Sequence, residues 1–156
     1  MSDASDPIDI QFAITPDGVP AEERLRHWVR LALAGRADNA ELSVRVVDEA
    51  EITALNHQYR GKDYPTNVLS FPYEAMPGVQ SALLGDIVIC APVVAREAVE
   101  QDKPVESHWA HMAIHGALHL LGHDHQDAAQ AQRMERLETQ LLEQLGFPDP
   151  YRSRDA

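Results

Sequence analysis

The chain has 156 residues, of which 44% are hydrophobic and 24% charged, as is usual for a globular protein. Its net charge of −12 argues against a simple nucleic-acid binder, because phosphate binding normally recruits a basic surface. No apolar run is long enough to span a bilayer, the acidic N-terminus lacks the pattern of a signal peptide, and the single cysteine, Cys90, excludes an internal disulfide.

These exclusions favour a cytoplasmic protein with no membrane partner, and the length favours one domain over 1–156 with flexible tails at 1–7 and 150–156.

Hydrophobic periodicity and turn residues predict the helices and strands along the chain. In the first half we expect a strand at 8–14, a helix at 21–34, a strand at 41–47, a short helix capped by Asp48, a loop at 61–66 and a strand at 68–71. After an irregular stretch at 73–82, we expect a strand around 87–89 and a helix at 93–100 with Pro92 in its first turn. A helix from Pro104 to Gly122 and a last helix that begins at Asp127 follow. The expected fold class is α+β, with a small mixed four-stranded sheet packed with about five helices. The order of the strands does not follow from the sequence.

The helix from Pro104 to Gly122 has a row of histidines on one edge and apolar side chains around the rest. At about 100° per residue, four histidines fall within an arc of roughly 80°; they are His108, His111, His115 and His119. Only Glu106, in the first turn, is charged, so we expect a buried central helix. Buried imidazoles need partners, because unpaired buried polar groups are costly.

Two explanations compete for this row. Any one of the histidines, taken alone, would more often bond a carbonyl or a carboxylate than a metal. Taken together, His115 and His119 lie one turn apart and point two ring nitrogens at a common cation, and His125 returns after the Gly122 turn as a third ligand. Catalytic zinc sites keep three protein ligands and an open position. The pattern therefore predicts one zinc ion on these three histidines, although imidazole sites also accept nickel, iron and copper.

The spacing of the motif matches the zinc-protease helix HExxHxxGxxH, except that Gly116 replaces the glutamate that shuttles protons. Amide hydrolysis relies on that glutamate, whereas phosphodiester cleavage has a better leaving group and depends more on charge stabilisation. We therefore favour a phosphate substrate over a peptide. Arg60 and Lys62 are the only cations between positions 46 and 95, and this isolated pair is either a solvated loop feature or an anion contact.

The histidine motif HGALHLLGHDH at 115–125, together with YRGKDYPTNVLSFP at 59–72 and LGDIVI at 84–89, resembles the YbeY family of bacterial rRNA-maturation endoribonucleases. The three blocks come in that family's order and spacing, and they anchor roughly residues 40–146. The family also has glycine in the protease's glutamate position. His123 is a minor departure, because the family often has tyrosine there.

The resemblance implies a metal-dependent, single-strand-specific endoribonuclease that acts in 16S rRNA 3′-end maturation and ribosome quality control. It implies zinc on His115, His119 and His125, and it places the family's arginine, used for catalysis or RNA contact, at Arg60. The expected partners are an rRNA precursor and the small ribosomal subunit or its proteins, with no DNA. The implied fold has helices around a four-stranded sheet, in agreement with the periodicity.

The alternatives are a zinc-binding ribosome-assembly factor without catalysis and, behind it, a metalloprotease. An acidic surface suits docking to basic ribosomal proteins, but structural zinc sites are usually closed by four protein ligands. For catalysis, the nucleophile is either a water activated at the metal or the neighbouring 2′-hydroxyl. Asp86, His111 and Asp124 are the candidate general bases; otherwise we expect His111, like His108, to pack or to support the ligands, and Asp124 to orient an imidazole or to be a turn residue.

Overall fold

The computed structural model describes residues 6–15, 17–73, 82–123 and 127–151. Within these ranges the chain forms β1 (Ile8–Phe12), α1 (Glu22–Leu33), β2 (Glu41–Val47), α2 (Glu49–Arg60), β3 (Val68–Pro72), β4 (Leu83–Cys90), α3 (Ala91–Glu100), α4 (Val105–Leu120) and α5 (Ala128–Gln144). The expected α+β class is confirmed. None of these helices is long and apolar enough to cross a bilayer. Most of the expected tails and of the irregular stretch at 73–82 lie outside the described residues. The described ends of the tails, Asp6 and Tyr151, make hydrogen bonds to the rest of the protein.

The strands form one mixed sheet in the order β1-β2-β4-β3. β1, β2 and β4 run parallel, while β3 pairs antiparallel with β4 at the edge. α1 supplies the crossover that two consecutive parallel strands require. Because side chains alternate between the faces of a strand, Ile87 and Ile89 of β4 lie on one face of the sheet and Asp86 and Val88 on the other.

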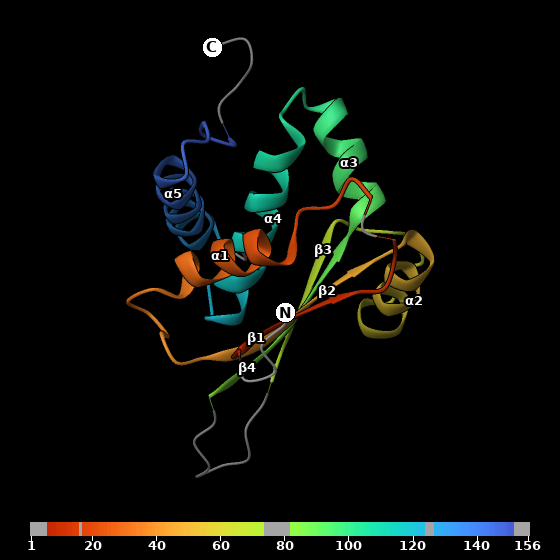
Figure 1. The fold of residues 1–156 in the computed structure, drawn as a ribbon, viewed down its shortest axis with the longest axis horizontal. Coiled ribbons are helices and arrows are strands. Elements are labelled where there is room, and N and C mark those ends of the chain that lie inside the picture. Colours follow the sequence, from red (N-terminus) through yellow and green to blue (C-terminus); the bar gives the residue numbers. More distant parts are fainter. Residues whose placement is uncertain (1–5, 16, 74–81, 124–126, 152–156) are drawn as a thin grey trace.

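Helices cover both faces unequally. Figure 1 shows α1, α4 and α5 on one side of the sheet and α2 on the opposite side. The larger hydrophobic core fills the first side, where α4 contacts α1, α5, β3 and β4. A smaller core, which includes Val47 and Ile52, lies under α2. α4 is thus the buried central helix that its composition predicts, and Trp109, Ile114 and Leu118 on it are almost fully buried.

Local side-chain contacts explain where two helices begin. Asp48 accepts a hydrogen bond from the backbone N–H of Glu51 at 2.9 Å, and Asp127 accepts one from the N–H of Gln130 at 2.8 Å. Each contact satisfies one of the N–H groups that a first helical turn leaves unpaired. α2 continues to Arg60, well beyond the short helix that periodicity indicated.

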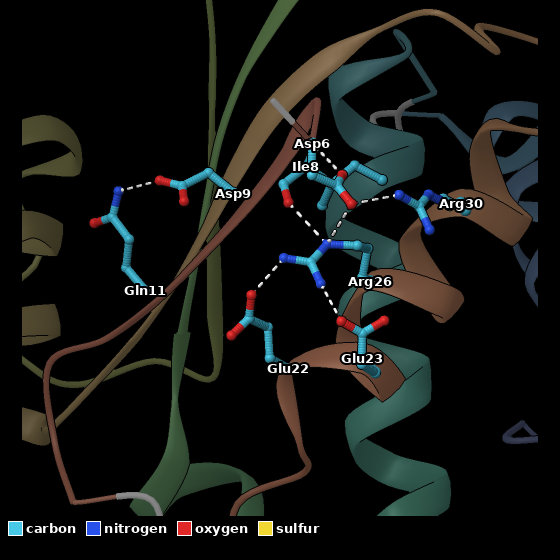
Figure 2. Close-up of polar contacts among 8 residues, drawn as sticks. All are labelled: Asp6, Ile8, Asp9, Gln11, Glu22, Glu23, Arg26 and Arg30. Atoms are coloured by element: carbon cyan, nitrogen blue, oxygen red, sulfur yellow. Dashed lines mark hydrogen bonds and ion pairs between the residues drawn. The ribbon is translucent and has the colours of Figure 1, made fainter. Parts of the chain in front are cut away.

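A buried arginine ties β1 to α1. Arg26 is 3% exposed, and its guanidinium donates to the carbonyl oxygen of Ile8 at 3.1 Å and to Glu22 and Glu23 at 2.6 and 2.7 Å (Figure 2). Asp6 contacts the same guanidinium at 3.1 Å. Burial acts to raise the pKa of the Asp6 carboxyl, but the backbone N–H of Ile8 and the nearby arginines outweigh burial and lower that pKa. Since carboxylates surround this guanidinium, the cluster stabilises the fold and offers no free charge to a ligand.

Candidate metal centre

The histidines of α4 lie in one row, as the helical spacing predicts. Between successive rings of His108, His111, His115 and His119, the centroids are 6.3, 6.2 and 5.2 Å apart. The first two are buried and the last two are half-buried. The row therefore runs from the interior of the protein toward solvent at the C-terminal end of the helix.

The turn that should follow this helix is present. Gly122 has a φ of +97°, a backbone conformation that favours glycine. The N–H of His123 donates to the carbonyl oxygen of Leu118 at 3.0 Å, so the chain leaves the helix directly after the row of histidines. Asp124 and the expected third ligand, His125, lie outside the described residues.

Gly116, the position of the protease glutamate, faces the sheet. A Cβ atom there would lie 2.7 Å from Cγ2 of Ile87, closer than two carbon atoms can approach. The carbonyl oxygen of Gly116 also accepts a hydrogen bond from the hydroxyl of Ser70 on β3 at 3.1 Å. A glutamate at this position would point at β4 and away from the histidine row. The close packing of α4 on the sheet therefore explains the glycine and leaves no room for the protease's base.

His115 and His119 fit the geometry of two ligands on one ion. Their ring centroids are 5.2 Å apart. Two imidazoles that bind one tetrahedral zinc ion at about 2.0–2.1 Å have their centroids about 5 Å apart. The described residues thus contain a pair of partly exposed imidazoles with the donor chemistry and the spacing that zinc requires.

A buried carboxylate from α5 lies beside the same histidines. Glu138 is 1% exposed, and its Oε1 accepts a hydrogen bond from Nδ1 of His115 at 3.2 Å. Its Oε2 contacts Nε2 of His111 and accepts a hydrogen bond from the hydroxyl of Tyr151 at 2.8 Å. Burial acts to raise the pKa of Glu138, but the hydrogen bonds from His111 and His115 outweigh burial and lower it to about 2. Burial and the Glu138 charge both raise the pKa of Tyr151, so the tyrosine is the donor.

His111, His115 and Glu138 can themselves hold a metal ion. Each offers one ligand atom, and these atoms lie within 4.8 Å of one another. The group shares His115 with the set predicted from the sequence and replaces the other two members. Two arrangements therefore involve the same carboxylate: it either binds an ion directly or holds His115 from behind while His115 and His119 bind the ion.

His108, the first histidine of the row, is bonded to a different carboxylate, Glu97. Its Nε2 is 2.8 Å from Oε1 of Glu97, which also accepts a hydrogen bond from the side chain of Asn67 at 3.0 Å. Burial lowers the pKa of His108, which favours the neutral imidazole. The histidine therefore links α4 to α3 and to the segment before β3, in the packing role that we expected.

The structure separates Asp86 from the histidines. Asp86 accepts a hydrogen bond from Ser43 of the neighbouring strand, on the face of the sheet opposite to Ile87 and α4. It is therefore not positioned to act as a base at the histidine row. His111, the second candidate base, already makes hydrogen bonds with Glu138 and Tyr151.

Arg60 is the last residue of α2 and its side chain is exposed. Among the residues that the structure describes, none forms a hydrogen bond or an ion pair with its guanidinium. Within the described ranges, no hydrogen bond or ion pair joins Arg60 to His115 or His119.

Sequence reasoning missed Glu138 and Tyr151. α5 contains several glutamates, but only Glu138 falls on its apolar stripe, four residues after Met134 and three before Leu141. A carboxylate among buried side chains requires hydrogen-bond donors. The position of Glu138 on the apolar stripe is therefore the sequence signal that could have identified this residue. No comparable signal points to Tyr151, which follows the helix in an irregular segment.

Two comparisons place these features among known proteins. A sequence model of the family described as endoribonuclease YbeY matches residues 13–146, a range that contains Arg60, the histidine row and Glu138. The chain is also similar to the solution structure of TM1509 from Thermotoga maritima, with 26% sequence identity and a TM-score of 0.59. That similarity covers 94% of this chain and 99% of the other.

Proposed function

The chain belongs to the YbeY family of endoribonucleases, and from this premise we propose that it is a zinc-dependent, single-strand-specific endoribonuclease of 16S rRNA 3′-end maturation and ribosome quality control. The observation that carries the zinc site is the pair of half-buried imidazoles, His115 and His119, with centroids 5.2 Å apart. His125 is the proposed third ligand. The proposed partners are an rRNA precursor and the small ribosomal subunit or its proteins, in the cytoplasm.

Charge stabilisation is the main task of such a site. Zinc, when bound, lowers the pKa of a water to about 7 and withdraws charge from a phosphoryl oxygen. Arg60 is proposed to contact the scissile phosphate and to stabilise the extra negative charge of the transition state through paired hydrogen bonds. Because the net charge of the chain is −12, RNA must be attracted by local cations such as Arg60 and Lys62 or be presented by the ribosome.

The packing of Gly116 supports a phosphate substrate over a peptide. A protease of this motif needs a glutamate beside the first histidine to carry protons to the leaving amine. Position 116 faces Ile87, so no side chain there can serve the histidines. Phosphodiester cleavage depends less on such a shuttle, because its leaving group is better.

Two nucleophiles give different products. Attack by water leaves a phosphate monoester on one fragment and a hydroxyl on the other. Attack by the neighbouring 2′-hydroxyl expels the 5′-hydroxyl of the next nucleotide and leaves a 2′,3′-cyclic phosphate. Analysis of the product ends therefore distinguishes the two routes without any assumption about the base.

The proposal is tested by metal content and cleavage measured on the same samples. The purified wild type, His119→Ala and Arg60→Ala are analysed for zinc and incubated with single-stranded RNA that carries the 3′ end of the 16S precursor. Arg36→Ala is the matched control, because Arg36 is an exposed arginine whose side-chain hydrogen bonds within the described residues go to the backbone carbonyls of Ala32 and Ala34. We expect His119→Ala to lose zinc and cleavage, and Arg60→Ala to keep zinc but lose about 10²–10³ in kcat.

Other results would contradict the proposal in distinct ways. Undiminished cleavage by zinc-free wild type would exclude the zinc mechanism. Cleavage of casein but not of RNA would assign the protein to the proteases. Zinc and ribosome binding without any RNA cleavage would favour an assembly factor.

A further inference from the structure

The carboxylate of Glu138 makes an unusual set of contacts for a fully buried acid. Two imidazoles and one phenol surround it, and its ion pairs among the described residues are with histidines, not with lysine or arginine. An ionised carboxylate only accepts hydrogen bonds, so Nδ1 of His115 and the hydroxyl of Tyr151 are both donors to it. The arrangement is therefore built to hold protons at defined atoms.

The contact at Nδ1 determines which nitrogen of His115 carries the proton. A neutral imidazole has one N–H and one bare nitrogen. Because Nδ1 donates to Glu138 at 3.2 Å, the nitrogen of the neutral His115 ring that carries no proton is Nε2. Histidines that bind metals commonly donate their other N–H to a carboxylate in this way, which fixes the tautomer and makes the ring a stronger ligand.

We propose that Glu138 is a positioning residue for the metal site: it holds the proton of His115 at Nδ1, so that Nε2 is presented to the zinc ion that His115 and His119 share. The inference rests on the proposed zinc site and deepens it. His111 and Tyr151 hold the second oxygen of the carboxylate and so prevent it from rotating toward the ion. The buried negative charge also favours a cation on the far side of the imidazole.

His111 belongs to this supporting group and is not a ligand. Its Nε2 faces Glu138 and lies 3.2 Å from the hydroxyl of Tyr151, and its Nδ1 is buried with no hydrogen-bond partner among the described residues. The alternative, in which His111, His115 and Glu138 bind the ion directly, requires Nδ1 of His115 to lose its proton and Glu138 to lose its donors. The two arrangements therefore predict different roles for His111 and His119.

Zinc affinity, measured with zinc alone and a competing chelator, tests the inference independently of RNA. Glu138→Gln keeps the size of the side chain but removes its charge, and it should weaken zinc binding about 10–100-fold. Glu143→Gln is the matched control, since Glu143 is exposed on the same helix, and it should bind zinc as the wild type does. His119→Ala should weaken binding more than Glu138→Gln, and His111→Gln, whose amide can still donate to Glu138, should weaken it less.

A spectroscopic measurement on the zinc-loaded wild type locates the proton of His115 directly. In long-range proton–nitrogen correlation spectra, with His115 assigned by its loss in His115→Ala, the zinc-loaded protein should keep its proton at Nδ1 and show the metal-induced shift at Nε2. Zinc bound at Nδ1, or zinc affinity unchanged in Glu138→Gln, would overturn the inference. Loss of binding in His111→Gln with none in His119→Ala would overturn it too, in favour of direct ligation. If zinc binding follows the expected order but the wild type does not cleave RNA, the inference stands and the proposed nuclease activity fails.

Discussion

Replacing Gly116 by alanine should lower the free energy of unfolding, even though alanine is the better helix former. The added Cβ would lie 2.7 Å from Cγ2 of Ile87 and 3.4 Å from its Cγ1 and Cδ1 atoms. Ile87 is fully buried and β-branched, so it cannot easily rotate away. Overpacking of this kind costs about 1–3 kcal/mol, and the gain in helix propensity offsets about 1 kcal/mol of it. We expect a net loss of about 1 kcal/mol.

A double-mutant cycle in urea, followed by circular dichroism, separates the two contributions. Ile87→Ala removes the obstructing methyl group, so Gly116→Ala should be neutral or stabilising in that background. The coupling between the two substitutions should therefore be at least about 1 kcal/mol. Ala54→Gly, at an exposed position in α2, measures the helix-propensity contribution alone. Stabilisation of the wild type by Gly116→Ala, or additive effects in the cycle, would refute the claim that this glycine exists to let α4 approach the sheet.

Three further predictions concern the buried charges of Arg26 and Glu138 and the partners of Glu138. Arg26→Met should lower the free energy of unfolding in urea by about 2 kcal/mol, because it removes the hydrogen bond to β1 and leaves Asp6 without its buried partner. An equal loss in Arg36→Met would contradict this reason, because it would show that only surface charge matters. Tyr151→Phe should cost about 1 kcal/mol, since it removes one donor from Glu138, and no change in the urea midpoint would contradict this. Folding lowers the pKa of Glu138 from the usual 4.5 to about 2. The ionised carboxylate therefore stabilises the metal-free folded protein by an amount on the order of 3 kcal/mol. This contribution is complete above pH 4.5 and is lost as the pH falls through 2. Unfolding measured from pH 6 to pH 3 should therefore show a shallower decline in Glu138→Gln than in the wild type, and parallel curves would contradict the assignment.

The sequence was sufficient to predict the helices and strands, because its local signals agree with one another. β2 alternates from Glu41 to Val46, Asp48 and Asp127 occur where helices need caps, and α4 beyond its first turn is apolar except for its histidine row. These features determine which side of an element is buried. They do not determine which strands are neighbours, because the apolar face of any one strand can pack beside that of any other.

The site was predictable only in part, for a related reason. His115 and His119 belong to one helix, so helical geometry alone brings them together. Glu138 reaches the same histidines from α5, and that contact depends on how two helices pack. The role of Gly116 likewise depends on the sheet: the missing glutamate was visible in the sequence, but the reason for it, Ile87, was not.

The central claim is that a zinc ion held by the histidines at the end of α4 enables the protein to cleave RNA. Its most direct test is a titration of the metal-free wild type with zinc, while cleavage of single-stranded RNA from the 16S precursor is followed. Cleavage should be absent without zinc and should rise until about one equivalent per chain is bound. Full cleavage before any zinc is added, or none at saturation, would contradict the claim.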